Sequence, residues 1–75
     1  MKEKIKTILE DALPLVDLES EFLMAELDSL DVTTIMMLLS DKFNIQVDAT
    51  DATPANFKSL DTLAEMVQRK MAGNA

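Results

Sequence analysis

The chain has 75 residues, contains neither cysteine nor histidine, and carries a net charge of −7. Its length suits one small domain, residues 1–75, whose stability must come from packed apolar side chains. Without cysteine or histidine, disulfides, thiol nucleophiles, Cys/His zinc sites and histidine general bases are excluded. A single glycine also excludes glycine-rich phosphate-binding loops. Most kinds of enzyme are excluded with them.

The negative charge is concentrated in the middle of the chain. Residues 10–61 hold 12 acidic and 2 basic side chains, which gives this segment a net charge of −10. Such a segment repels nucleic acids and anionic membranes and attracts basic protein partners. The longest apolar run, residues 35–39, is far too short to span a membrane. Because the N-terminus lacks an apolar leader segment, the sequence predicts a soluble cytoplasmic protein. No metal site is expected, because the loop of Asp48 and Asp51 lacks the central glycine and the final glutamate of an EF-hand calcium loop.

The first predicted helix ends near residue 13. Its apolar side chains recur with the spacing of one helix face at Ile5, Ile8, Leu9, Ala12 and Leu13. Pro14 disfavours helical geometry at Leu13, so the helix should end there. Residues 14–28 then form a long first loop, and its apolar residues predict that it packs against the core.

A second helix is predicted to begin after Asp28, whose carboxylate can accept a hydrogen bond from a free backbone N–H. Its core-facing stripe is predicted to consist of Val32, Ile35, Met36, Leu39 and Phe43. Met37 lies off that stripe, so we expect it to be exposed. Residues 44–52 are predicted to form a second loop, in which Val47 points inward.

The remaining residues predict a short helix and a long one. Thr53-Pro54 places a cap before a proline at the first helical position and predicts a short helix to about Phe57. A last helix should begin near Ser59 and stop just before Gly73. Its inward stripe is predicted to be Leu60, Leu63, Ala64, Val67 and Met71. The fold class is therefore all-α, a small bundle of three main helices plus one short helix, with a long first loop.

The tripeptide Ser-Leu-Asp occurs twice, at residues 29–31 and 59–61, each time at a predicted helix start. We interpret Ser59, which follows Lys58, as a helix cap only. Ser29 lies at the edge of the long loop, and a helix N-terminus there would stabilise a phosphate or phosphodiester on its hydroxyl. A bare serine cannot activate itself, so another protein would have to modify it.

The whole pattern resembles the acyl carrier protein family. The resemblance covers almost the full chain, from the acidic composition and long first loop to Asp28-Ser29-Leu30-Asp31 at the start of a helix. It implies that Ser29 carries 4′-phosphopantetheine, transferred from coenzyme A by a phosphopantetheinyl transferase, with Asp28, Leu30 and Asp31 as motif neighbours. The thiol of that group holds acyl intermediates as thioesters, which fits the lack of cysteine. The resemblance thus implies a carrier used by other enzymes, not an enzyme.

Some features differ from the usual family pattern. Glu26 stands where the family commonly has glycine, residues 32–42 are less acidic than usual, and residues 47–57 form a slightly longer segment. These differences favour a specialised polyketide, lipid or aminoacyl pathway over housekeeping fatty-acid biosynthesis. Two alternatives stay open: a peptidyl or D-alanyl carrier, and, from a different class, an unmodified acidic protein-interaction module.

The resemblance also implies where partner enzymes bind. Acyl-transfer and synthase enzymes with basic docking patches are expected on the outward face of the second helix of a monomeric carrier. The residues of that face are Leu30, Asp31, Thr34, Met37 and Asp41. Because its charge is thin, we expect the apolar Leu30 and Met37 to contribute more to docking than apolar residues usually do in the family.

Overall fold

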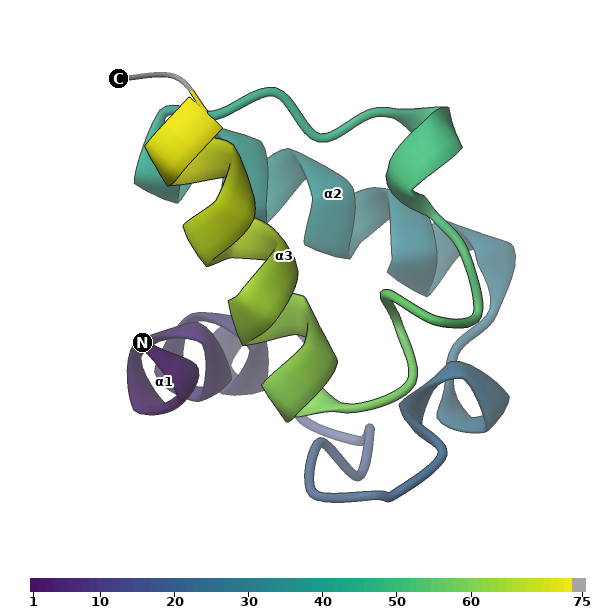
Figure 1. The fold of residues 1–75 in the computed structure, drawn as a ribbon. Helices are drawn as coiled ribbons and strands as arrows, with labels where there is room; N and C mark the ends of the chain where they lie inside the picture. Colours follow the sequence, from purple (N-terminus) through teal and green to yellow (C-terminus); the bar gives the residue numbers. More distant parts are fainter. Residues whose placement is uncertain (74–75) are drawn as a thin grey trace.

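The computed structural model describes residues 1–73, which form three α-helices around a shared core (Figure 1). The helices are α1 (Lys2–Ala12), α2 (Ser29–Phe43) and α3 (Leu60–Gly73), and each packs against the other two. Two short 3₁₀ helices, η1 (Leu23–Glu26) and η2 (Ala49–Asp51), lie in the connections. No strand occurs in residues 1–73, and no helix there combines the length and apolar character that crossing a membrane requires. The predicted all-α bundle is confirmed.

Helix α1 ends where Pro14 predicts. Leu13 leaves the helical conformation but still donates its N–H to the Leu9 carbonyl oxygen at 2.7 Å. The helix buries Ile5 and Leu9 completely, and Leu13 is buried just beyond its end. Ala12 is exposed, because the core-facing stripe is narrower at this end of the helix than the spacing predicts.

The first loop lies against the core as predicted, and in Figure 1 it passes close to the start of α3. Leu18 and Leu23 are buried, so the loop contributes its own part of the core. The Leu23 N–H donates to the Lys58 carbonyl oxygen at 2.6 Å, which ties η1 to the segment before α3. An ion pair of 3.0 Å between Lys6 and Glu19 ties the loop to α1, and it raises the pKa of Lys6.

Helix α2 presents the predicted stripe to the core. Ile35 and Leu39 are fully buried, whereas Val32 and Phe43, nearer the two ends of the helix, are half-buried and pack on the edge of the core. The Lys4 ammonium lies 5.7 Å from the centre of the Phe43 ring, which covers one side of that ring. Asn44 ends the helix in the left-handed conformation, with φ of 53°.

The short helix predicted for Thr53–Phe57 does not form. The expected cap contact is present, since the Asn56 N–H donates to Thr53 Oγ1 at 3.1 Å, and the Phe57 N–H donates to the Thr53 carbonyl oxygen at 3.0 Å. These bonds close turns only. Phe57 is fully buried and anchors the chain there, and α3 begins at Leu60. The second loop instead contains η2, and Val47 is buried within it as predicted.

Helix α3 buries Leu60, Leu63, Ala64 and Val67, four members of its predicted stripe. The fifth, Met71, is 44% exposed, while Met66 is almost completely buried instead. The buried face of the helix is therefore wider near its middle than the predicted stripe, and it ends before the last turn. Gly73 is the last residue of the helix and not the position after it.

Candidate functional site

The start of α2 is closed by two reciprocal hydrogen bonds. Asp28 is the capping residue in extended conformation, and its Oδ1 accepts from the Asp31 N–H at 2.8 Å. In return, Asp31 Oδ2 accepts from the Asp28 N–H at 3.2 Å. The Val32 N–H donates to the Asp28 carbonyl oxygen at 3.0 Å and completes the first turn. The predicted cap at Asp28 is confirmed, and Asp31 is its reciprocal partner in a capping box.

Ser29 is the first residue of α2, and its side chain is exposed. Its hydroxyl takes part in no hydrogen bond within residues 1–73. Every other serine and threonine hydroxyl donates or accepts one, namely those of Thr7, Ser20, Thr33, Thr34, Ser40, Thr50, Thr53, Ser59 and Thr62. The sequence holds no tyrosine, so within residues 1–73 the hydroxyl of Ser29 is the only side-chain hydroxyl without a hydrogen bond.

The second Ser-Leu-Asp triplet is placed differently at the start of α3. Ser59 precedes the helix and caps it: its Oγ accepts from the Thr62 N–H at 3.4 Å, and its own N–H donates to Thr62 Oγ1 at 3.0 Å. Ser59 is half-buried, and its hydroxyl is engaged. The prediction that Ser59 acts as a cap is confirmed by these bonds.

The outward face of α2 carries four of the five residues predicted for partner binding in one stripe, whereas Asp31 lies to one side of it, half-buried in the capping box. Leu30 is 73% exposed and Met37, two turns further along, is 66% exposed. Asp41 continues the stripe and is exposed. Thr34 is half-buried between them, and its hydroxyl donates to the Leu30 carbonyl oxygen at 3.0 Å. The expected exposure of Met37 is confirmed.

The negative charge near Ser29 is not neutralised by neighbouring cations. Within residues 1–73, ion pairs join Lys2 to Asp61, Lys6 to Glu19 and Lys70 to Asp51. None of them involves Glu26, Asp28 or Asp31 in that part of the chain. Carboxylates without an ion-pair partner in residues 1–73 therefore flank the exposed hydroxyl, and they would attract a basic surface.

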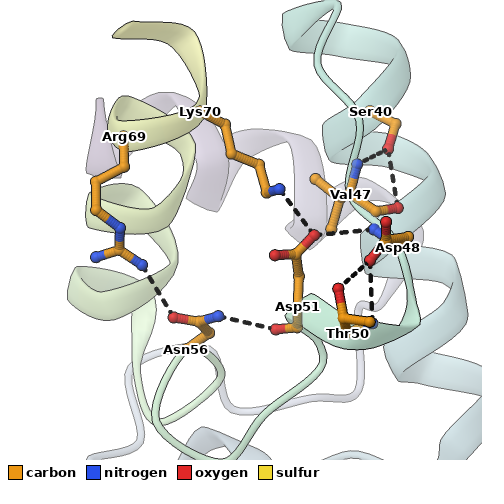
Figure 2. Close-up of polar contacts among 8 residues, drawn as sticks. All are labelled: Ser40, Val47, Asp48, Thr50, Asp51, Asn56, Arg69 and Lys70. Carbon is orange, nitrogen blue, oxygen red and sulfur yellow. Dashed lines mark hydrogen bonds and ion pairs between the residues drawn. The ribbon is translucent and has the colours of Figure 1, made fainter. Parts of the chain in front are cut away.

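The loop before α3 contains a polar network that the sequence did not indicate (Figure 2). Lys70 lies 2.9 Å from Asp51, whose carboxylate also accepts from the Asp48 N–H. These contacts lower the pKa of Asp51, with the Lys70 hydrogen bond as the largest cause. Arg69, the residue before Lys70, donates to the Asn56 side chain at 3.1 Å, and Asn56 in turn donates to the Asp51 carbonyl oxygen at 3.0 Å. The network fastens the loop to α3. Asp51 and Lys70 are far apart in the sequence, so no local pattern predicts that they meet.

The Ser40 hydroxyl holds the other side of the same loop. It accepts from the Val47 N–H at 3.1 Å, which joins the loop to the last turns of α2 (Figure 2). The loop is thus attached to α2 through Ser40 and to α3 through Asp51. Within residues 1–73, no group of three or more acidic, histidine or cysteine side chains is arranged to hold a metal ion.

A surface pocket of about 330 Å³ lies at the start of α3 and not beside Ser29. Leu18 and Leu60 form apolar parts of its wall, and Ser59 lies among its lining residues. The signal that distinguishes Ser29 is hydrogen bonding, because its hydroxyl is exposed and unpaired within the described residues.

Comparison with known proteins identifies the family of this chain. The family model described as "Phosphopantetheine attachment site" matches residues 2–69. Acyl carrier protein 4, chloroplastic, of Arabidopsis thaliana is 34% identical over an alignment 77 positions long, which covers 93% of this chain and 56% of that protein. The chain thus spans little more than half the length of that relative. No solved structure matches this chain.

Proposed function

Because this chain belongs to the phosphopantetheine attachment family of acyl carriers, we propose that Ser29 is the residue that bears its prosthetic group. That group is 4′-phosphopantetheine, held covalently, and its thiol carries an acyl chain as a thioester. One observation supports the assignment to Ser29 above the others. Its hydroxyl is exposed and free of hydrogen bonds within residues 1–73, whereas the other serine and threonine hydroxyls there are engaged.

The backbone at Ser29 suits an attached phosphodiester. The first N–H groups of a helix have no partner inside the helix, and within residues 1–73 those of Ser29 and Leu30 take part in no other hydrogen bond. They and the positive end of the helix dipole favour a negative group on the Ser29 oxygen. Asp28 and Asp31 hold this turn in place. Since no base contacts the hydroxyl, the transferase supplies the base that removes its proton.

We further propose that the outward face of α2 receives the enzymes that act on the carried group. Carrier proteins work with transferases and synthases, and here Leu30, Met37 and Asp41 form an exposed stripe that begins beside Ser29. Asp31 and the half-buried Thr34 complete that face. The acidic chain steers basic enzymes toward it, while contact with Leu30 and Met37 slows their dissociation. We assign the carrier to fatty-acid or specialised polyketide or lipid biosynthesis, and it is not itself an enzyme.

The attachment is tested by incubating the apo protein with coenzyme A, Mg²⁺ and a phosphopantetheinyl transferase of broad specificity. Intact mass should rise by one phosphopantetheine, and fragmentation should place it on Ser29. A modification mapped to Ser59 would contradict the assignment. A mass that stays unchanged would favour an unmodified acidic interaction module. Loading of the modified protein by an amino-acid-activating enzyme, and not by acyltransferases, would identify a peptidyl or D-alanyl carrier.

The docking face is tested with the same transferase as the partner. We expect Met37→Ala and Leu30→Ala to raise the KM for the apo protein at every salt concentration, because they remove apolar contact. Added salt should raise the KM of the parent, because it screens the attraction between charges. Met71→Ala is the matched control, since Met71 is also exposed but lies on the last turn of α3. Equal KM values for the parent and Met37→Ala would show that Met37 is not part of the docking face.

A further inference from the structure

The Asp31 carboxylate has a structural partner of its own. It is half-buried, and its Oδ2 accepts from the N–H of Asp28, the capping residue directly before α2. Together with the bond from the Asp31 N–H to Asp28 Oδ1, this closes a ring of residues 28–31 around Ser29. The Thr33 hydroxyl donates to the Ser29 carbonyl oxygen at 3.0 Å and fixes that peptide from the other side. The backbone of Ser29 is held on both sides while its hydroxyl stays free.

Two other reciprocal capping boxes in the described chain show what is particular to this one. The box of Asp48 and Asp51 begins η2, and Asp51 also binds Lys70. The box of Ser59 and Thr62 begins α3, and there the serine is itself part of the box. Both fasten a loop to the rest of the molecule. At Asp28 and Asp31, within residues 1–73, no cation takes part and the enclosed side chain is an exposed hydroxyl.

We propose that Asp31 is a positioning residue for the modification of Ser29. Its Oδ2 holds the Asp28 N–H, and this bond keeps the first turn of α2 closed so that the backbone that carries the Ser29 side chain keeps one conformation. The inference rests on the proposed attachment at Ser29. The Asp31 carboxylate then has two tasks: its Oδ2 orders the turn, and its negative charge attracts the transferase.

Three substitutions at Asp31 separate these tasks. Asp31→Asn keeps a carbonyl oxygen that can accept from the Asp28 N–H but removes the charge. Asp31→Ala removes both, and Asp31→Glu restores both, since glutamate is a common residue at this position of a capping box. Asp61→Ala is the matched control, because it removes one carboxylate from the other Ser-Leu-Asp triplet, where the aspartate takes no part in the box.

The measurement is the steady-state rate at which a broad phosphopantetheinyl transferase modifies the full apo chain with coenzyme A. Asp31→Ala should lower kcat by about 3- to 10-fold, the range expected for the loss of one capping interaction, and raise KM. Asp31→Asn should raise KM with kcat near that of the parent. Asp31→Glu should recover both constants, and Asp61→Ala should leave both unchanged. Amide exchange at Asp28 should accelerate in Asp31→Ala alone, which reports the bond itself in the folded protein.

The outcomes distinguish the two proposals. Equal loss of kcat in Asp31→Asn and Asp31→Ala would show that charge alone matters and would overturn the positioning role. A parent modified at Ser29 with Asp31→Ala equally fast would overturn it as well. A parent that is not modified at all would overturn the attachment at Ser29 and this inference with it. Faster exchange at Asp28 in Asp31→Ala, together with the kcat loss confined to that variant, supports it.

Discussion

Residues 29–31 and 59–61 have the same sequence, Ser-Leu-Asp, but the helix begins at a different position of each triplet: α2 begins at the serine and α3 at the leucine. In α2 the serine is the first helical residue and its hydroxyl is free, whereas in α3 the serine precedes the helix and caps it. The leucines differ accordingly: Leu30 is 73% exposed and Leu60 is 2% exposed. One position along a helix turns a side chain by about 100°. The same three residues thus make an exposed site in one place and a buried anchor in the other.

The residues that precede the two triplets differ in whether they can cap a helix. Asp28 has a carboxylate that accepts from the backbone N–H three residues later, so the helix begins after it and Ser29 is left uncommitted. Lys58 has no acceptor, so capping falls to Ser59 and α3 begins one residue later relative to the triplet. The two serines therefore take different places at their helix starts: Asp28 provides the cap before Ser29, whereas Ser59 is itself the cap and is engaged with Thr62.

The largest difference is expected between the two serines. Ser29→Ala should abolish phosphopantetheine attachment, and Ser59→Ala should leave it intact, as read by intact mass. Their effects on stability should be reversed: Ser59→Ala should cost about 1 kcal/mol because it removes a cap, and Ser29→Ala should cost much less. Urea unfolding of both apo variants measures this. Attachment that survives Ser29→Ala would remove the distinction between the triplets.

A harder test gives α3 the preceding residue of α2. Lys58→Asp combined with Ser29→Ala creates Asp-Ser-Leu-Asp at the start of α3. We still expect no attachment at Ser59, because its hydroxyl is engaged with Thr62 and Leu60 is anchored in the core. A mass increase on Ser59 would show that the local sequence alone is sufficient for modification.

The leucines of the two triplets should differ by several kcal/mol in stability. Leu60→Ala should lower the free energy of unfolding by roughly 2–5 kcal/mol, because it removes a buried side chain from a small core. Leu30→Ala should change it by less than about 0.5 kcal/mol, since Leu30 is mostly exposed. Urea titrations of the two apo variants give both values. Comparable losses would mean that Leu30 packs against the protein in solution.

The loop before α3 is held by an ion pair that the start of α2 lacks, so acid should affect the two regions differently. The pKa of Asp51 lies below its ordinary value of 3.8 because Lys70 stabilises the carboxylate. That stabilisation is present above the unfolded pKa and is lost as pH falls through the folded one. Lys70→Met should therefore cost roughly 1 kcal/mol at neutral pH, and the difference from the parent should shrink below about pH 4.

Thermal or urea unfolding between pH 7 and pH 2 measures this narrowing. Lys42→Met is the control, because Lys42 is exposed in the last turn of α2 and forms no ion pair within residues 1–73. Its difference from the parent should not depend on the titration of Asp51. A Lys70→Met difference that stays constant to pH 2 would contradict the role of this pair.

The smallest effect is expected at the second aspartate of the comparison. Asp61 lies 3.3 Å from Lys2, but both side chains are largely exposed, 71% and 43%. Exposed ion pairs contribute little, so Asp61→Asn should shift the free energy of unfolding by less than about 0.5 kcal/mol and leave the modification rate unchanged. A tenfold slower modification would show that the transferase also contacts the start of α3.

Much of this molecule follows from local sequence. The spacing of Ile35, Leu39 and the residues around them predicts α2 and its buried face, and Asp28 predicts where it begins. Pro14 predicts the end of α1. The motif around Ser29 is equally local, since its features lie within four consecutive residues. The prediction fails at Thr53–Phe57, where the capping bonds form but the burial of Phe57 draws the chain into turns.

The sequence by itself determined the helices, the buried stripes and the candidate serine, because each depends on residues within about one or two turns of one another. Only the tertiary structure decided the contacts between distant residues. Asp51 meets Lys70 and Leu23 meets Lys58 because the loops fold back over the helices. It also decided that Ser29 alone keeps a free hydroxyl in residues 1–73, since whether a hydroxyl is engaged depends on which donors and acceptors the fold brings to it.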